Sequence, residues 1–94
     1  MARSTELVIH NRSGLHARPA AKFVQAAAGF RSSITVRNAS RNGTAVDAKS
    51  ILGVLGLGVS AGHRIVLTVD GDDQDAAVAA LTELVESGIG ERED

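Results

Sequence analysis

One histidine stands between a polar loop and a helix-forming run, and this is where the sequence could do chemistry. Residues 11–14 are polar or glycine, His16 follows, and an alanine-rich run extends from Ala17 to Ala28. The first turn of a helix has backbone N–H groups without intrahelical partners, and its dipole adds partial positive charge. Such a position favours anions, phosphate above all. The pattern therefore predicts a nucleophilic imidazole at the edge of a phosphate-binding site.

The residues around His16 fit this chemistry. Arg18 supplies a planar, permanently charged donor group that matches phosphate oxygens, and we expect it to clamp a phosphoryl group. Pro19 is tolerated in a first helical turn because its missing N–H is not needed there. The Ser13 hydroxyl could contact a phosphoryl oxygen or form an ordinary turn bond, and both interpretations stay open. Because the helix dipole and Arg18 both disfavour an imidazolium, we expect a neutral and nucleophilic ring.

A second segment could take a regulatory modification. Ser50 precedes a short apolar run and is well placed as the N-cap of a helix over 50–57. A phosphoryl group there would sit at a helix N-terminus, where a dianion is tolerated. Four apolar residues share this short helix. We expect a split in which one or two of them face outward and form a docking patch, although all four could pack inward. These four are Ile51, Leu52, Leu55 and Leu57.

Hydrophobic periodicity predicts the elements that must position these residues. We expect strands at Thr5–Ile9, Ser33–Arg37, Thr44–Asp47 and Arg64–Val69, with a hairpin at Asn42-Gly43. Helices are expected over 17–28, over 50–57, and from the acidic residues 72–75 to Gly88. The first of these helices should bury Phe23, Val24, Ala27 and Ala28, and the last should bury Val78, Leu81 and Val85.

The predicted order β-α-β-β-α-β-α indicates an α+β fold. Helices should cover one face of a four-stranded antiparallel sheet, although the residues alone do not distinguish this from a ferredoxin-like sandwich. The 94 residues are expected to form a single domain, 1–94. A formal net charge of −1 gives no general attraction to nucleic acid or anionic membranes. The chain has no cysteine, which excludes a thiolate site.

Two segments together resemble one known family. Gly14-Leu15-His16-Ala17-Arg18-Pro19-Ala20 is similar to the active-site segment of the HPr family, the histidine-containing phosphocarriers of the bacterial phosphoenolpyruvate:sugar phosphotransferase system. Ala48-Lys49-Ser50-Ile51-Leu52-Gly53 resembles the regulatory serine site of the same family. The two motifs have the family's order and separation, and the resemblance covers the chain from about Thr5 to Ser87.

This resemblance implies an open-faced β-sandwich with strand order 1-4-2-3 and a phosphocarrier that is not a complete turnover enzyme. The carrier would work in the cytoplasm without cofactor or metal, accept a phosphoryl group on Nδ1 of His16 from enzyme I, and pass it to enzyme IIA or IIB domains. A serine kinase/phosphorylase acting on Ser50 and a transcriptional regulator would be further partners, with no direct binding to nucleic acid or membrane. The expected docking residues are Leu15, Ala20, Lys49, Ile51, Leu52 and Leu55.

Three other functions stay open at this point. One is a regulatory protein in which phosphorylated Ser50 makes the domain a co-repressor or effector, a role that could coexist with phosphoryl transfer. The second is a paralogous carrier in nitrogen-related signalling or dihydroxyacetone phosphorylation, and the third is a ferredoxin-like ligand-binding module without phosphoryl chemistry. His10 and His63 show no metal-ligand spacing and are expected at the surface. The connection 38–44 looks longer than is usual in the family. Residues 91–94 form an acidic extension that we expect to be a frayed tail.

Overall fold

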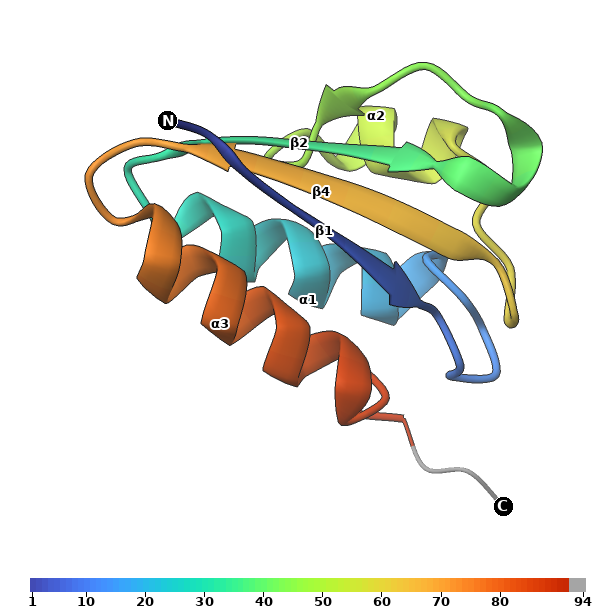
Figure 1. The fold of residues 1–94 in the computed structure, drawn as a ribbon. Coiled ribbons are helices and arrows are strands. Elements are labelled where there is room, and N and C mark those ends of the chain that lie inside the picture. The colour runs from blue at the N-terminus through green and yellow to red at the C-terminus, as the bar shows by residue number, and fades with distance from the viewer. Residues whose placement is uncertain (92–94) are drawn as a thin grey trace.

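The computed structural model describes residues 1–91 and has the predicted order β-α-β-β-α-β-α (Figure 1). The strands are β1 Arg3–Val8, β2 Ser33–Asn38, β3 Val46–Asp47 and β4 Arg64–Asp70. The helices are α1 Ala17–Ala28, α2 Ile51–Gly56 and α3 Gln74–Glu86. A short 3-10 turn, η1 Ala39–Arg41, follows β2.

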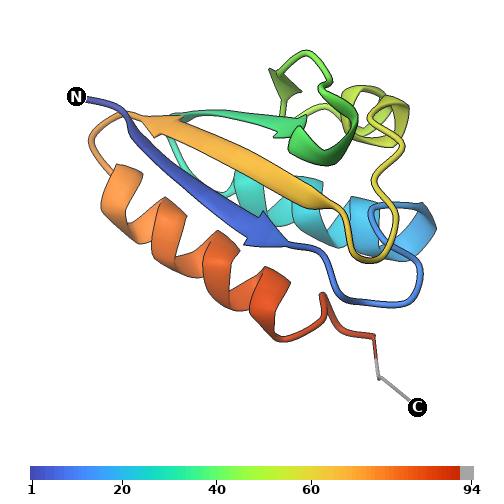
Figure 2. The same ribbon diagram turned by 45° about the vertical axis from the view of Figure 1, so that its right-hand side comes forward.

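The four strands form one antiparallel sheet in the order β1-β4-β2-β3, which confirms the order expected from the resemblance. The long strand β4 lies in the middle and pairs with β1 on one side and β2 on the other. Helices α1 and α3 lie across one face of the sheet, and α2 packs against α1 and β3 (Figures 1 and 2). The start of α1 and the helix α2 therefore lie toward the same end of the molecule.

Alternation along β2 and β4 gives the sheet its buried face. Its fully or almost fully buried side chains are Ile34, Val36, Ile65, Leu67 and Val69. From the helices, α1 contributes Phe23 and Ala27, and α3 contributes Ala77, Val78, Leu81 and Val85. The prediction that Ala28 is buried is wrong, because Ala28 is exposed at the end of α1, and Val24 is only half-buried. Ala28 lies five residues after Phe23, and this spacing on a helix places it well away from the face on which Phe23 lies.

The connection between β2 and β3 differs from the predicted hairpin. Asn38 is fully buried, and its side chain accepts the Ser40 N–H at 3.1 Å and donates to the Leu57 carbonyl at 3.3 Å. These bonds hold the chain in the turn η1, after which Asn42 adopts a left-handed φ of 51°. Strand β3 is consequently two residues long instead of the predicted four, and its pairing with β2 begins at Val46.

Asp73 links the start of α3 to the segment that leads into β2. Its carboxylate accepts hydrogen bonds from the hydroxyl and N–H of Ser32 and from the Arg31 N–H, the last two at 2.9 and 2.8 Å. These bonds, the one from the Ser32 hydroxyl first, lower the pKa of Asp73 below its ordinary value of 3.8. Asp73 is the N-cap residue of α3, yet its side chain makes no capping bond to that helix. Its carboxylate thus ties two segments together in addition to complementing the helix dipole.

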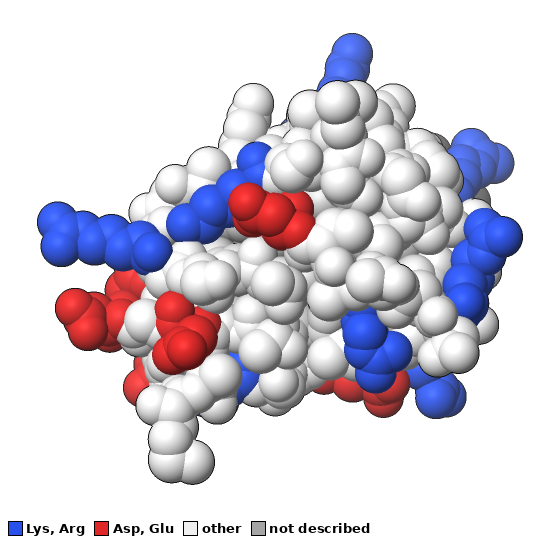
Figure 3. Space-filling view, turned by 90° about the horizontal axis from the view of Figure 1, so that it is seen from above, with Lys and Arg blue, Asp and Glu red and all other residues white. Residues whose placement is uncertain are grey.

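The molecule shows no concentrated basic face in the view onto the sheet side opposite α1 and α3. There, basic side chains are scattered over the rim and the face itself, and acidic side chains lie beside several of them (Figure 3). No helix within residues 1–91 combines the length and the apolar character needed to cross a bilayer.

Candidate functional site

His16 is the N-cap residue of α1, and it is exposed. Its backbone is extended, with φ −124° and ψ 158°, and its side chain makes no capping hydrogen bond to the helix. The predicted helix over 17–28 is confirmed at both ends. The imidazole is therefore exposed to solvent at the start of the helix. It does not cap the helix, which would have been a purely structural role.

The segment before His16 is fixed by contacts with the loop after α2. Gly14 has φ 62°, and a Cβ at this position would lie 2.2 Å from the Val59 carbonyl oxygen. The next residue, Leu15, donates its N–H to the same oxygen at 2.9 Å, and its side chain is fully buried. His16 thus follows directly on a residue that is anchored in the core.

The first turn of α1 is distorted at Ala17. This residue has a left-handed φ of 48°, and the bond from the Ala20 N–H to the His16 carbonyl is long, at 3.5 Å. A non-glycine residue in this conformation costs on the order of 1 kcal/mol. Because Pro19 has no N–H, the helix-start donors nearest His16 are the amides of Ala17 and Arg18. These amides can donate hydrogen bonds to an anionic group attached to the ring of His16.

Two of the expected docking residues do not lie at the surface. Leu15 and Ala20 are fully buried, so the prediction that their side chains contact a partner is wrong. The core beneath the start of α1 needs these apolar side chains, and they support His16 from below. A third, Lys49, is half-buried and donates from Nζ to the Phe30 carbonyl at 2.8 Å, across to the segment after α1.

Arg18 faces a pocket of about 350 Å³ beside the first turn of α1. The pocket is lined by Arg12, Arg18, Pro19, Lys22, Ile89, Gly90 and Glu91. Three cationic side chains therefore gather two to six residues from His16 in sequence, which is the electrostatic setting that a phosphoryl group requires. Sequence patterns indicated Arg18 alone, since Arg12 and Lys22 come together with it only through the fold.

Ser13 is hydrogen-bonded to the segment after α3, a contact that no local sequence pattern indicates. Its N–H and hydroxyl donate to the two oxygens of the Glu91 carboxylate at 2.9 and 2.8 Å, and Asn11 Nδ2 donates to the same group at 2.8 Å. The Asn11 amide, followed by the two Ser13 donors, lowers the pKa of Glu91 below its ordinary value of 4.5. Glu91 is thus docked, which corrects the prediction of a frayed tail, while residues 92–94 lie outside the described residues. Of the two interpretations for the Ser13 hydroxyl, the structure shows the one in which it holds the loop.

Helix α2 has the predicted cap and a divided apolar surface. Ser50 Oγ accepts the Gly53 N–H at 3.1 Å, which confirms the N-cap. The side chains of Leu52, Ile51 and Leu55 are exposed to 80, 40 and 37%, whereas Leu57 is half-buried against the core. The predicted division between inward and outward residues is therefore confirmed, but three residues face outward where one or two were expected. We call Ile51, Leu52 and Leu55 the α2 patch.

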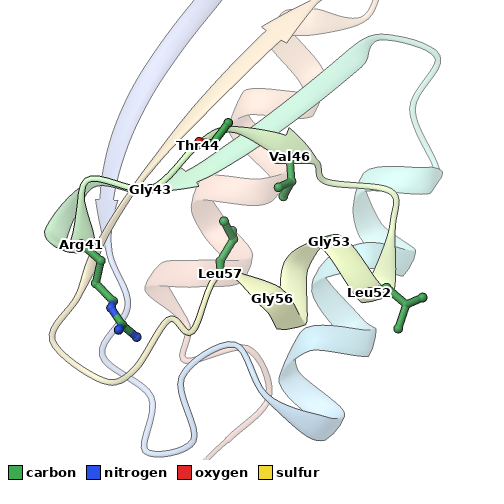
Figure 4. Close-up of a pocket in the computed structure, with 8 residues that line it drawn as sticks. All are labelled: Arg41, Gly43, Thr44, Val46, Leu52, Gly53, Gly56 and Leu57. Carbon is green, nitrogen blue, oxygen red and sulfur yellow. The ribbon is translucent and has the colours of Figure 1, made fainter.

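A shallow pocket of about 530 Å³ lies between α2 and the segment around β3. Val46 and Leu57 point into the space between the two segments, whereas Leu52 points outward from α2 (Figure 4). The pocket thus lies beside the α2 patch and shares no lining residue with the cationic pocket of Arg18.

The other two histidines have hydrogen bonds within the fold. His63, expected at the surface, is half-buried, and its Nδ1 accepts the Ser60 N–H at 3.1 Å and lies 3.1 Å from Asn38 Nδ2. His10 is exposed as expected, and its Nε2 lies 2.9 Å from the Glu86 carbonyl oxygen. Both rings help to hold loops in place, which favours His16 as the reactive histidine.

Comparison with known sequences leads to one family. A family model described as "PTS HPr component phosphorylation site" matches residues 3–87. The phosphocarrier protein HPr of Xylella fastidiosa is 44% identical, over 92% of this chain and 93% of its own length. The phosphocarrier protein HPr of Cupriavidus necator is 42% identical, over 99% of both chains. The multiphosphoryl transfer protein of Salmonella typhimurium is 39% identical, and there the chain spans only 23% of the relative's length.

The fold agrees with this comparison. The crystal structure of HPr-C-His from Thermoanaerobacter tengcongensis superposes with a TM-score of 0.91 at 45% identity, covering 97% of this chain and 99% of that one. A phosphocarrier protein HPr from Bacillus anthracis has a TM-score of 0.83 at 36% identity, over 89% and 96%. The architecture is therefore not that of a ferredoxin-like sandwich but that of a phosphoryl carrier. The chain belongs to the HPr family of the phosphotransferase system.

Proposed function

We propose that His16 accepts a phosphoryl group from enzyme I and passes it to the enzyme IIA or IIB domains of sugar-specific enzymes II. The observation that carries this proposal is an exposed histidine at the N-cap of α1 whose side chain does not cap the helix. The helix-start amides and the cationic pocket of Arg18 supply donors for the phosphoryl oxygens. Membership of the HPr family supports the same role.

In the proposed step, the lone pair on Nδ1 of the neutral His16 ring forms the new N–P bond. The bond between phosphorus and the donor atom breaks, and its electron pair stays with the donor. The ring keeps its proton on Nε2, so the phosphorylated imidazole is cationic beside a dianionic phosphoryl group. Onward transfer reverses these changes, with a nucleophile of the enzyme II domain as the new acceptor.

An exposed site suits a carrier better than a complete enzyme. A carrier must hold the phosphoryl group only moderately, because strong stabilisation of the adduct would raise the barrier to onward transfer. Arg18 is proposed as a clamp that follows the phosphoryl group in both directions. Since this group stays accessible to solvent, the partner supplies the remaining walls of the reaction site.

The α2 patch is the proposed docking surface for these partners. Its residues Ile51, Leu52 and Leu55 are exposed, and α2 packs against α1, whose first residue follows His16. Exposed apolar side chains on a small protein commonly mark contact surfaces. Ser50 lies at the edge of this patch, so its phosphorylation by a serine kinase/phosphorylase is proposed to regulate docking or to recruit a transcriptional regulator.

A two-step transfer experiment tests the proposal. The chain is incubated with enzyme I and labelled phosphoenolpyruvate, separated from enzyme I, and then mixed with an enzyme IIA domain. The proposal predicts that label enters the chain only when enzyme I is present and leaves it when the IIA domain is added. A chain that takes up no label, or that takes it up and cannot release it, would contradict the carrier role.

A further inference from the structure

The chain after α3 makes an unusual turn that brings it back to the phosphorylation loop. Gly88, Ile89 and Gly90 have consecutive left-handed φ values of 85, 53 and 77°. For Ile89, a β-branched residue, this conformation is strongly disfavoured. Its side chain is almost fully buried, and its N–H donates to the Leu84 carbonyl at 3.0 Å. Burial in the core therefore holds a strained backbone that determines where the next residues lie.

The result of this turn is a defined position for the Glu91 carboxylate. Oε1 accepts hydrogen bonds from Asn11 Nδ2 at 2.8 Å and from the Ser13 N–H at 2.9 Å, and Oε2 accepts the Ser13 hydroxyl at 2.8 Å. Asn11 is fully buried, and its Nδ2 also donates to the Gly14 carbonyl at 2.9 Å. One carboxylate thus holds both donors of Ser13 and, through Asn11, is connected to the backbone at Gly14.

These contacts hold a negative charge in the pocket that Arg18, the proposed phosphoryl clamp, also lines. Glu91 lines the same pocket as Arg12, Arg18 and Lys22. The Ser13 hydroxyl, a potential donor to a phosphoryl oxygen, is committed to Glu91. A phosphoryl dianion on His16 that Arg18 clamps would therefore share that cation's surroundings with a fixed carboxylate. Like charges in such a setting repel, and the repulsion falls on the phosphorylated state alone.

We propose that Glu91 is a positioning residue for phosphoryl transfer at His16. Its carboxylate holds the loop of residues 11–14 and lowers the stability of the phosphorylated form, which therefore donates its phosphoryl group more readily. The proposal rests on the proposed function, because it requires His16 to carry the phosphoryl group. The carboxylate acts through Ser13, Asn11 and the local electric field, without contact to the reacting atoms. Removal of its charge should shift the equilibrium toward the phosphorylated carrier.

The test compares three variants at equilibrium. Wild type, Glu91→Gln, Glu91→Asp and the control Glu83→Gln are incubated with enzyme I and a fixed ratio of phosphoenolpyruvate to pyruvate until the phosphorylated fraction is constant. Glu83 lies exposed on α3, so its substitution changes the net charge by the same amount as Glu91→Gln. The fraction is measured by intact-protein mass spectrometry, and thermal unfolding is recorded for each variant.

We expect Glu91→Gln to raise the equilibrium constant for phosphorylation by roughly threefold to tenfold, the size of one like-charge interaction in a solvated site. Glu83→Gln should match wild type, and Glu91→Asp, which keeps the charge, should restore the wild-type equilibrium. A purely structural role would alter unfolding or rates and leave the equilibrium constant unchanged, and that result would overturn the inference. If wild type itself takes up no phosphoryl group, the proposed function fails instead, so the two failures are distinguishable.

Discussion

The Leu15 N–H donates to the Val59 carbonyl oxygen at 2.9 Å, and this bond ties the residue before His16 to the loop after α2. Gly14 allows the approach, since any Cβ there would lie 2.2 Å from the same oxygen and φ is 62°. The position of the histidine therefore depends on a glycine that precedes it by two residues.

Gly14→Ala should consequently destabilise the protein by several kcal/mol, because the clash involves backbone atoms that cannot rotate away and the φ value is unfavourable. Thermal unfolding measures the loss. Gly56→Ala is the matched control, since a Cβ at Gly56 meets nothing within 4 Å, and it should leave stability unchanged or slightly higher. Equal stability of Gly14→Ala and wild type would show that this loop is not held as described.

Arg18→Ala should slow phosphoryl exchange with enzyme I about tenfold to a hundredfold while the fold stays intact. The estimate follows from about 1.5–3 kcal/mol for a charge-assisted contact with the phosphoryl group. Single-turnover kinetics measure the rate, and Arg31→Ala, an exposed arginine just before β2, is the control. If both variants transfer at the wild-type rate, Arg18 is only a surface residue.

Phosphorylation of Ser50 should weaken docking of enzyme I without unfolding the domain. The dianion suits the N-terminus of α2, but it lies at the edge of the α2 patch, and a partner must desolvate it. We expect KM for enzyme I to rise on the order of tenfold or more, with an unchanged melting temperature. Ser50→Ala separates the two roles of this residue: loss of the cap should cost about 1 kcal/mol of stability and leave KM near that of wild type. If phosphorylation left KM unchanged, Ser50 would have only a structural role.

Asp73 should make stability fall in acid. Its pKa is lowered in the folded state by the Ser32 hydroxyl and the Arg31 N–H, so its stabilising contribution is present above the ordinary value of 3.8 and is lost as the pH falls through the lower folded value. Asp73→Asn should be less stable than wild type at neutral pH and should lose less of its remaining stability below that value. Asp72→Asn, at a neighbouring exposed position, is the control. Parallel pH profiles for wild type and Asp73→Asn would contradict this assignment.

Local signals in the sequence predict much of the fold and the centre of the site. The helix over 17–28 follows from the polar loop before it, Pro19 in its first turn and Gly29 after it, and its bounds are confirmed. Ser50 is recognisable as an N-cap because a hydroxyl residue precedes an apolar run. The strand order could not be derived this way, since pairing between β1 and β4 joins segments about sixty residues apart, and it came only with the family resemblance.

The errors share a physical cause, which is that long-range contacts override local preference. The resemblance implied docking at Leu15 and Ala20, which belong to the same segment as His16, but the core beneath α1 buries them. The acidic composition of residues 91–94 predicted a frayed tail, yet Glu91 bonds to Ser13 across 78 positions of sequence. The run Gly88-Ile89-Gly90 indicates a turn, but nothing in it shows which loop the turn reaches.

The proposed carrier role depends most directly on which atom is phosphorylated. Wild type, His16→Ala, His10→Ala and His63→Ala should each be incubated with enzyme I and phosphoenolpyruvate, and the product mapped by phosphorus NMR and peptide mass spectrometry. We predict an acid-labile, alkali-stable phosphoramidate on His16 that is absent only from His16→Ala. Retained phosphorylation in His16→Ala, or an adduct mapped to another residue, would contradict the central claim.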